Sequence, residues 1–155
     1  MELQPGRKEP HYQLALLFGE QGAVRDAIAQ FEAALSLDPD FAQAHNDLGN
    51  TLLSLGDTEE AIRHFRTALE LRPGFDVAEF NLGVAHGLLG RLEEAEARYR
   101  KALESNPGFA MAHNNLGTVL ISLGRPEEAR EEFRRALAIE PDLAEAHTNL
   151  RLATP

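Results

Sequence analysis

The chain has 155 residues, of which 43% are hydrophobic and 26% are charged, close to the averages of globular domains. The net charge of −10 argues against nucleic acid and anionic membrane surfaces as partners, because phosphate groups attract clustered Lys and Arg. The absence of cysteine excludes disulfides, zinc–thiolate sites and thiol nucleophiles. No apolar run is long enough to span a bilayer, and the first ten residues are unlike a secretory signal, so we expect a cytoplasmic protein.

Residues recur along the chain at intervals of 34 positions, which is typical of a helical-repeat array. Four independent series share this period: Pro39, Pro73, Pro107 and Pro141; Gly22, Gly56, Gly90 and Gly124; Ala27, Ala61, Ala95 and Ala129; and the aromatic series Phe31, Phe65, Tyr99 and Phe133. The period predicts a single array with a lead (1–7), four repeats (8–41, 42–75, 76–109 and 110–143) and a tail (144–155).

Each repeat is predicted to hold two amphipathic helices separated by a glycine. In repeats two to four they cover residues 42–55 and 58–71, then 76–89 and 92–105, then 110–123 and 126–139. Gly56 suits the left-handed conformation that ends a helix, and Asp57 with Glu60 is expected to cap the next one. Pro126 fits the first turn of its helix, and the repeated prolines are expected to end the second helices.

Glycine in the middle of the first helices predicts a close approach of the second helix. Gly49, Gly83 and Gly117 hold these positions, at a cost of about 1 kcal/mol each relative to alanine. We expect the small residues Ala61, Ala95 and Ala129 to face them and the aromatic residues to fill the wider gaps.

These positions resemble the tetratricopeptide repeat. The likeness rests on residues such as Ala44, Leu48, Gly49, Gly56, Ala61, Phe65, Ala68, Leu69 and Pro73. The resemblance implies an all-α, right-handed superhelical solenoid of four helix-turn-helix repeats, with the first helices lining a concave groove and the second helices facing outward. Most charged residues of repeats two to four do fall in the second-helix stretches.

The tail continues the first-helix pattern but has Arg151 where earlier repeats have glycine. A bulky cation at that position obstructs a partner helix. We therefore expect residues 144–155 to form a capping helix. The alternative is that the sequence was cut within a longer array of repeats.

The expected groove is nearly uncharged and rich in amide side chains, which offer both donors and acceptors for the backbone of an extended polypeptide. The candidate amides are Asn81, Asn115 and Asn149 in one column, Asn46 and Asn114 one residue before it, and Asn50 one turn further along. Asp47 and Gln13 replace asparagine in the column. An apolar patch beside them comprises Val77, Phe80, Val84, Leu88, Met111 and Ile121, of which Phe80 and Met111 are the expected exposed anchors.

The asparagine column resembles the concave row of the tetratricopeptide region in O-linked N-acetylglucosamine transferases, which implies that it holds substrate polypeptide. The alternative is that these asparagines bond the backbone of a neighbouring helix or cap a turn. The carboxylate clamp of co-chaperone members is not expected, because Val77, Asn46 and Asn115 occupy the positions where that clamp needs cations.

No catalytic, metal or cofactor motif is found, and we expect a non-catalytic chain. His11, His45, His113 and His147 recur at one repeat position, but neighbouring repeats hold them too far apart to share a metal ion. We expect their rings to fill an aromatic packing position instead.

Three hypotheses follow for function. The first is a protein–protein interaction module that binds an extended peptide or a partner helix. The second is a scaffold that assembles as a homo-oligomer through its terminal helices. The third is a fragment of a larger enzyme, such as a glycosyltransferase, that presents protein substrates.

Overall fold

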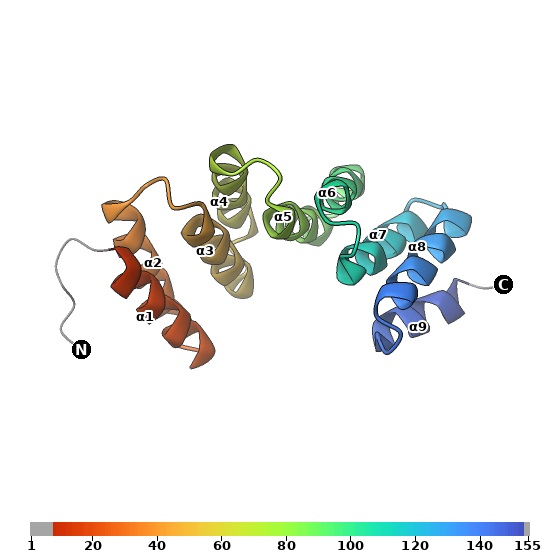
Figure 1. Cartoon of the computed structure of the whole chain (residues 1–155), viewed down its shortest axis with the longest axis horizontal. Coiled ribbons are helices and arrows are strands. Elements are labelled where there is room, and N and C mark those ends of the chain that lie inside the picture. The colour runs from red at the N-terminus through yellow and green to blue at the C-terminus, as the bar shows by residue number, and fades with distance from the viewer. Residues whose placement is uncertain (1–7, 154–155) are drawn as a thin grey trace. The chain divides into compact units, whose positions relative to one another are not determined.

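The computed structural model describes residues 8–153, and all regular secondary structure in that part of the chain is helical. The predicted lead, residues 1–7, and the last two residues of the tail lie outside it. Figure 1 shows the helices in chain order: α1 (Lys8–Glu20), α2 (Val24–Leu37), α3 (Ala42–Leu55), α4 (Thr58–Leu71), α5 (Asp76–Leu88), α6 (Leu92–Ser105), α7 (Ala110–Ser122), α8 (Pro126–Ile139) and α9 (Ala144–Leu152). The helix boundaries predicted for repeats two to four agree with these to within one residue, whereas the helix predicted over residues 144–155 ends at Leu152.

The chain divides into two compact units. Unit 1 is Met1–Pro73 and contains α1 to α4, whereas unit 2 is Gly74–Pro155 and contains α5 to α9. Within each unit, successive helices pack as helical hairpins joined by short turns (Figure 1). The prediction of an all-α helical-repeat solenoid is confirmed.

The first helix of a repeat ends at its glycine. Gly56 has a φ of 85°, in the left-handed region, and its N–H donates to the carbonyl of Leu53 while the next N–H, of Asp57, reaches Leu52. The expected side-chain cap by Asp57 is wrong, because this carboxylate makes no capping hydrogen bond. Its backbone has a ψ of 56°, outside the extended region from which a capping side chain reaches the first turn.

The mid-helix glycines face aromatic rings of the second helices. A Cβ atom added to Gly49 would lie 2.7 Å from Cε1 of Phe65, and one added to Gly117 would lie 2.5 Å from Cε1 of Phe133. Gly83 has the same relation to Tyr99, also at 2.7 Å. The rings therefore set the close approach, and the expectation that alanines face these glycines is wrong.

The alanines of the second helices contribute to the core in another way. Ala61, Ala95 and Ala129 are fully buried, as are the rings of Phe65 and Phe133. A small side chain at these positions lets the helices pack closely, and each buried aromatic ring contributes roughly 1.5–3 kcal/mol. Each second helix thus combines a buried aromatic ring with buried alanines in the core.

The ninth helix ends against α8. The guanidinium of Arg130 in α8 donates a hydrogen bond of 2.8 Å to the carbonyl oxygen of Ala153, directly after α9. A cation at this end of a helix also complements the helix dipole. Arg151 is exposed at the position where α3, α5 and α7 have glycine, so α9 lacks the groove into which an aromatic ring fits.

Candidate functional site

In unit 1, the polar side chains on the first helices bond to one another around Asp47 of α3. The Asp47 carboxylate accepts hydrogen bonds from the hydroxyl of Tyr12 (2.7 Å), the amide of Gln43 (3.1 Å) and the amide of Asn46 (2.9 Å). Burial and the bond to Asp47 raise the pKa of Tyr12. This face of unit 1 therefore uses its polar groups internally.

In unit 2, the corresponding polar side chains lie on α7 and α9. The Asn149 amide nitrogen donates to the Asn114 side-chain oxygen at 3.0 Å, and the Asn114 amide nitrogen is 3.3 Å from the side-chain oxygen of Asn115. The hydroxyl of Thr118 donates to the backbone carbonyl of Asn114. These bonds orient the amides of Asn115 and Asn149, which remain half-buried.

Two of the predicted peptide-binding amides are buried. Asn46 and Asn114 are each only 2% exposed, so little of either amide is accessible, although Asn114 contributes to the lining of a cavity between α7 and α9. Successive residues of a helix point about 100° apart, which turns them inward while Asp47 and Asn115 face outward. Their amide nitrogens lie within hydrogen-bond distance of the next side chain on the same helix, Asp47 or Asn115, which is neither the open groove nor the bond to a neighbouring helix backbone that the two interpretations proposed.

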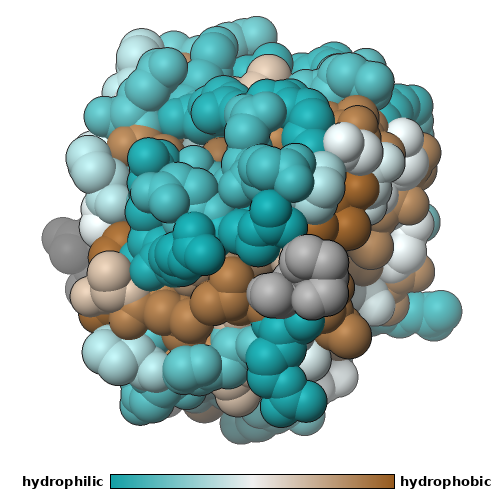
Figure 2. Space-filling model, turned by 90° about the vertical axis from the view of Figure 1, so that its right-hand side faces the viewer, coloured by the Kyte–Doolittle hydropathy of each residue, from teal (hydrophilic) through white to brown (hydrophobic). Residues whose placement is uncertain are grey.

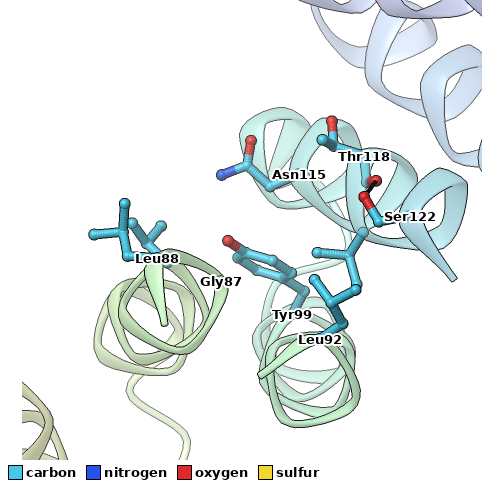
Figure 3. A pocket seen from close by; sticks show the side chains of 9 residues that line it. Gly87, Leu88, Leu92, Tyr99, Asn115, Thr118 and Ser122 are labelled. Carbon is cyan, nitrogen blue, oxygen red and sulfur yellow. Dashed lines mark hydrogen bonds between the residues drawn. The ribbon is translucent and has the colours of Figure 1, made fainter. Parts of the chain in front are cut away.

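A cavity of about 290 Å³ opens between α5, α6 and α7. Figure 3 shows the Tyr99 ring of α6 between α5 and α7, with Leu88 on one side and Asn115 on the other. The cavity is lined by Val84, Gly87, Leu88, Leu92, Tyr99, Asn115, Thr118, Val119 and Ser122, none of which is charged. The arrangement places apolar walls beside a rim of amide and hydroxyl groups.

The Tyr99 hydroxyl is the polar group at the floor of this cavity. Burial raises the pKa of Tyr99 to about 12, although its hydrogen bond with Asn115 acts in the opposite direction. The phenol is therefore neutral at physiological pH and fixes one side of the Asn115 amide. The other repeats have phenylalanine at this position, so the hydroxyl was a signal that sequence reasoning did not use.

A second cavity, of about 440 Å³, lies between α7 and α9. Its lining comprises Asn114, Asn115, Thr118, Ala144, Glu145, Thr148 and Asn149. It shares Asn115 and Thr118 with the first cavity, so the two are adjacent across α7. Glu145 is the only charged residue among the residues that line either cavity.

The remaining predicted contacts differ in exposure. Asn50 and Val77 are exposed, while Asn81 and Met111 are half-buried. The Phe80 ring is also half-buried, because it packs 4.7 Å from the Phe109 ring and 5.7 Å from the Tyr99 ring. Phe80 thus belongs mainly to the packing behind the first cavity, whereas Leu88 is 65% exposed at its rim.

Three of the four recurring histidines tie the first helix of a repeat to the second. Nδ1 of His11 lies 2.8 Å from the amide oxygen of Gln30, and Nδ1 of His45 lies 2.9 Å from Nδ1 of His64. His113 is 2.6 Å from Glu132. These three rings lie between the two helices as expected, and they also make polar bonds. The packing expected of His147 is wrong, because this ring is exposed, with its Nε2 2.7 Å from the carbonyl oxygen of Pro141.

Residues 8–153 contain no group of three or more His, Asp or Glu side chains placed to hold a metal ion. In the same range, every helix is too short or too polar to cross a membrane.

Comparisons with known proteins agree with this architecture. Family models described as tetratricopeptide repeat match residues 12–74 and 80–144, and a second such model matches residues 52–99. A search of curated protein sequences finds no relative.

Solved structures share the fold at low sequence identity. The crystal structure of MamA protein superposes with a TM-score of 0.85 at 23% identity, over 94% of this chain and 80% of that one. The structure of MamA 41-end from Desulfovibrio magneticus RS-1 superposes with a TM-score of 0.81 at 23% identity. The match covers 90% of this chain and 79% of that one. A chain in the crystal structure of the APC/C hetero-tetramer Cut9-Hcn1 superposes with a TM-score of 0.90 at 23% identity. The match covers 97% of this chain but only 30% of that longer chain.

Proposed function

Because the chain belongs to the tetratricopeptide-repeat family, whose fold commonly mediates protein–protein interaction, we propose that it is a non-catalytic module that binds an extended segment of a partner protein. The binding surface is the pair of adjacent cavities on unit 2, between α5 and α7 and between α7 and α9. We call this surface the α5–α7–α9 face. The observation that carries the proposal is that the two cavities share Asn115 and Thr118.

The chemistry of the α5–α7–α9 face supports binding of main chain. An amide side chain offers a donor and an acceptor, the same pair that a peptide backbone presents. Asn115 and Asn149 are half-buried at the cavity walls and are held by neighbouring side chains, which lowers the entropy lost when they bind. Asn81 of α5 and Met111 of α7 line neither cavity, but they lie on two of the same helices and are proposed as further contacts within unit 2, as is Val77 of α5. Asn50 of α3 is a separate candidate in unit 1.

The proposal is tested by replacing Asn81 and Asn115 together with alanine. A phage-displayed library of 12-residue peptides, selected on the full chain, supplies the ligand, and calorimetric titration measures its affinity. We expect the double variant to bind about tenfold or more weakly, since two hydrogen bonds to the peptide are lost, while circular dichroism reports unchanged helicity.

The exposed residue Gln21 in the first turn of unit 1 provides the control. Gln21→Ala removes an amide of the same chemistry away from the α5–α7–α9 face and should leave the affinity unchanged. Equal affinities for the wild type, the double variant and the control would refute the proposal.

A second candidate function is self-association through the C-terminal end of unit 2. Figure 2 looks at the molecule from that side and shows a band of hydrophobic surface between hydrophilic areas. Two large apolar side chains are exposed there, Leu152 of α9 at 80% and Ile139 of α8 at 39%. Light scattering over a concentration series tests this function: a Leu152-dependent dimer supports it, and a strict monomer removes it.

A further inference from the structure

We infer that the partner segment carries one bulky apolar side chain and, two or three residues away, a lysine or arginine. The apolar side chain enters the cavity between α5 and α7, and the cation lies in the cavity between α7 and α9 beside Glu145. This inference rests on the proposed function, because it specifies which peptides the α5–α7–α9 face selects.

The first cavity fits an apolar side chain of the partner. Its walls include Val84, Leu88, Leu92 and Val119, and its lining contains no charged residue that would pair with a polar guest. A volume of about 290 Å³ is at the lower limit for cavities that hold small organic ligands, so one large side chain is a better match than a cofactor. Leu88 is 65% exposed at the rim, and a guest side chain would remove this apolar surface from water.

The second cavity fits a cation. Glu145 is exposed in the first turn of α9, and no ion pair of its carboxylate is found within residues 8–153. The other lining groups are amides, hydroxyls and one alanine, so Glu145 supplies the only charge there. A lysine or arginine of the partner would therefore find an available carboxylate and amide acceptors nearby.

The distance between the cavities sets the separation of the two peptide residues. Both cavities border α7 and share Asn115 and Thr118, so their centres are separated by about one helix packing distance, roughly 8–10 Å. An extended chain advances about 3.3 Å per residue. Two or three residues thus span the two cavities, with Asn115 next to the main chain between them.

Charge also determines which segments are rejected. The protein has a net charge of −10, and no Lys or Arg lines either cavity. An acidic segment would lose hydration without gaining an opposite charge, and a terminal carboxylate would do so as well. The occupant is therefore a non-acidic segment of a partner protein that does not place its C-terminal carboxylate in either cavity.

The test is selection of a phage-displayed library of 12-residue random peptides on the full wild-type chain and on variants. We expect the wild type to enrich peptides in which Leu, Ile, Val, Met or Phe lies two or three residues from Lys or Arg. Glu145→Lys should reverse the charge preference toward Asp and Glu. In titrations with one selected peptide, Glu145→Gln should weaken binding up to about fivefold, the upper end for an exposed ion pair.

Two substitutions test the apolar cavity and provide matched controls. Leu88→Gln should weaken binding several-fold, while Leu37→Gln, on a leucine of α2 that is 43% exposed, should not. Glu93→Gln, on an exposed carboxylate of α6, is the control for Glu145. These sites are exposed, so all the variants should retain wild-type helicity.

The outcomes separate the two proposals. If selected peptides compete with one another and depend on Asn81 and Asn115, but show no apolar–basic pairing and no change with Glu145→Lys, the inference is wrong and the proposed function stands. If no peptide is enriched, or if binding is insensitive to every substitution on the α5–α7–α9 face, both are wrong.

Discussion

The two units use the same helix positions in different ways. In unit 1, Asp47 is surrounded by donors from Tyr12, Gln43 and Asn46, and this polar cluster is closed within the protein. In unit 2, Asn115 occupies the equivalent repeat position, but it lies on the wall shared by two cavities. A repeat position therefore does not define a function; the neighbours on the adjoining helices decide whether the side chain stabilises the fold or faces a ligand.

Replacing the central group of each unit should produce the largest contrast. Asp47→Ala removes the acceptor of three donors, and since hydrogen bonds to a charged group contribute more than neutral ones, we expect a loss of about 2–3 kcal/mol in the free energy of unfolding. Asn115→Ala should cost about 1 kcal/mol or less. Urea denaturation measures both, and equal losses would contradict the distinction between the units.

Removing one donor sharpens the same comparison. Tyr12→Phe deletes the hydroxyl that binds Asp47 and should cost about 1–2 kcal/mol, because the carboxylate keeps its other two donors. Tyr99→Phe deletes a hydroxyl at the cavity floor, where Asn115 is its partner, and should cost less. A larger effect at Tyr99 than at Tyr12 in thermal or urea unfolding would break the comparison.

Repeats 1 and 4 also differ in the residue at the position where the first helix approaches the aromatic ring of the second. Repeat 1 has the buried Ala15 where repeat 4 has Gly117, whose added Cβ would meet the Phe133 ring at 2.5 Å. Gly117→Ala should destabilise by about 1–2 kcal/mol, because overpacking exceeds the gain in helix propensity. Gly19→Ala, at a site of α1 with no atom within 4 Å of the added Cβ, should stabilise by up to about 1 kcal/mol.

The smallest predicted effect is a pH dependence that arises from His64 in unit 1. Burial and the neighbouring His45 lower the pKa of His64 below its ordinary value of 6.5. The His64 ring therefore binds a proton more readily in the unfolded chain than in the folded one. The stability that the neutral ring contributes is complete above pH 6.5, and it is lost as the pH falls through the lower pKa of the folded state. His64→Gln should flatten the curve of unfolding free energy between pH 7.5 and 5.5; a curve unchanged by the substitution would refute this assignment.

The sequence predicted the helices well because their signals are local. The bounds of α3, α4, α6 and α8 match the predictions, and Gly56 has the positive φ that a helix-ending glycine requires. Each of these features depends on residues within one or two turns of the chain. The 34-residue period then repeats the same local signals four times.

The candidate site was only partly predictable, because it depends on contacts between repeats. Asn114 and Asn115 are adjacent in sequence, yet Asn114 is only 2% exposed whereas Asn115 is half-buried and lines both cavities. The bond from Tyr12 to Asp47 joins helices of two repeats, and no local pattern reveals it. Glu145 became a candidate only when its position beside the second cavity was known.

The most direct test of the account follows the asparagine side chains while a peptide binds. We would titrate a library-selected peptide into the full ¹⁵N-labelled chain and record the side-chain amide resonances by NMR. We predict that the resonances of Asn115 and Asn149 shift with a common affinity while that of the buried Asn46 does not move. Saturable binding that leaves Asn115 and Asn149 unperturbed would contradict it.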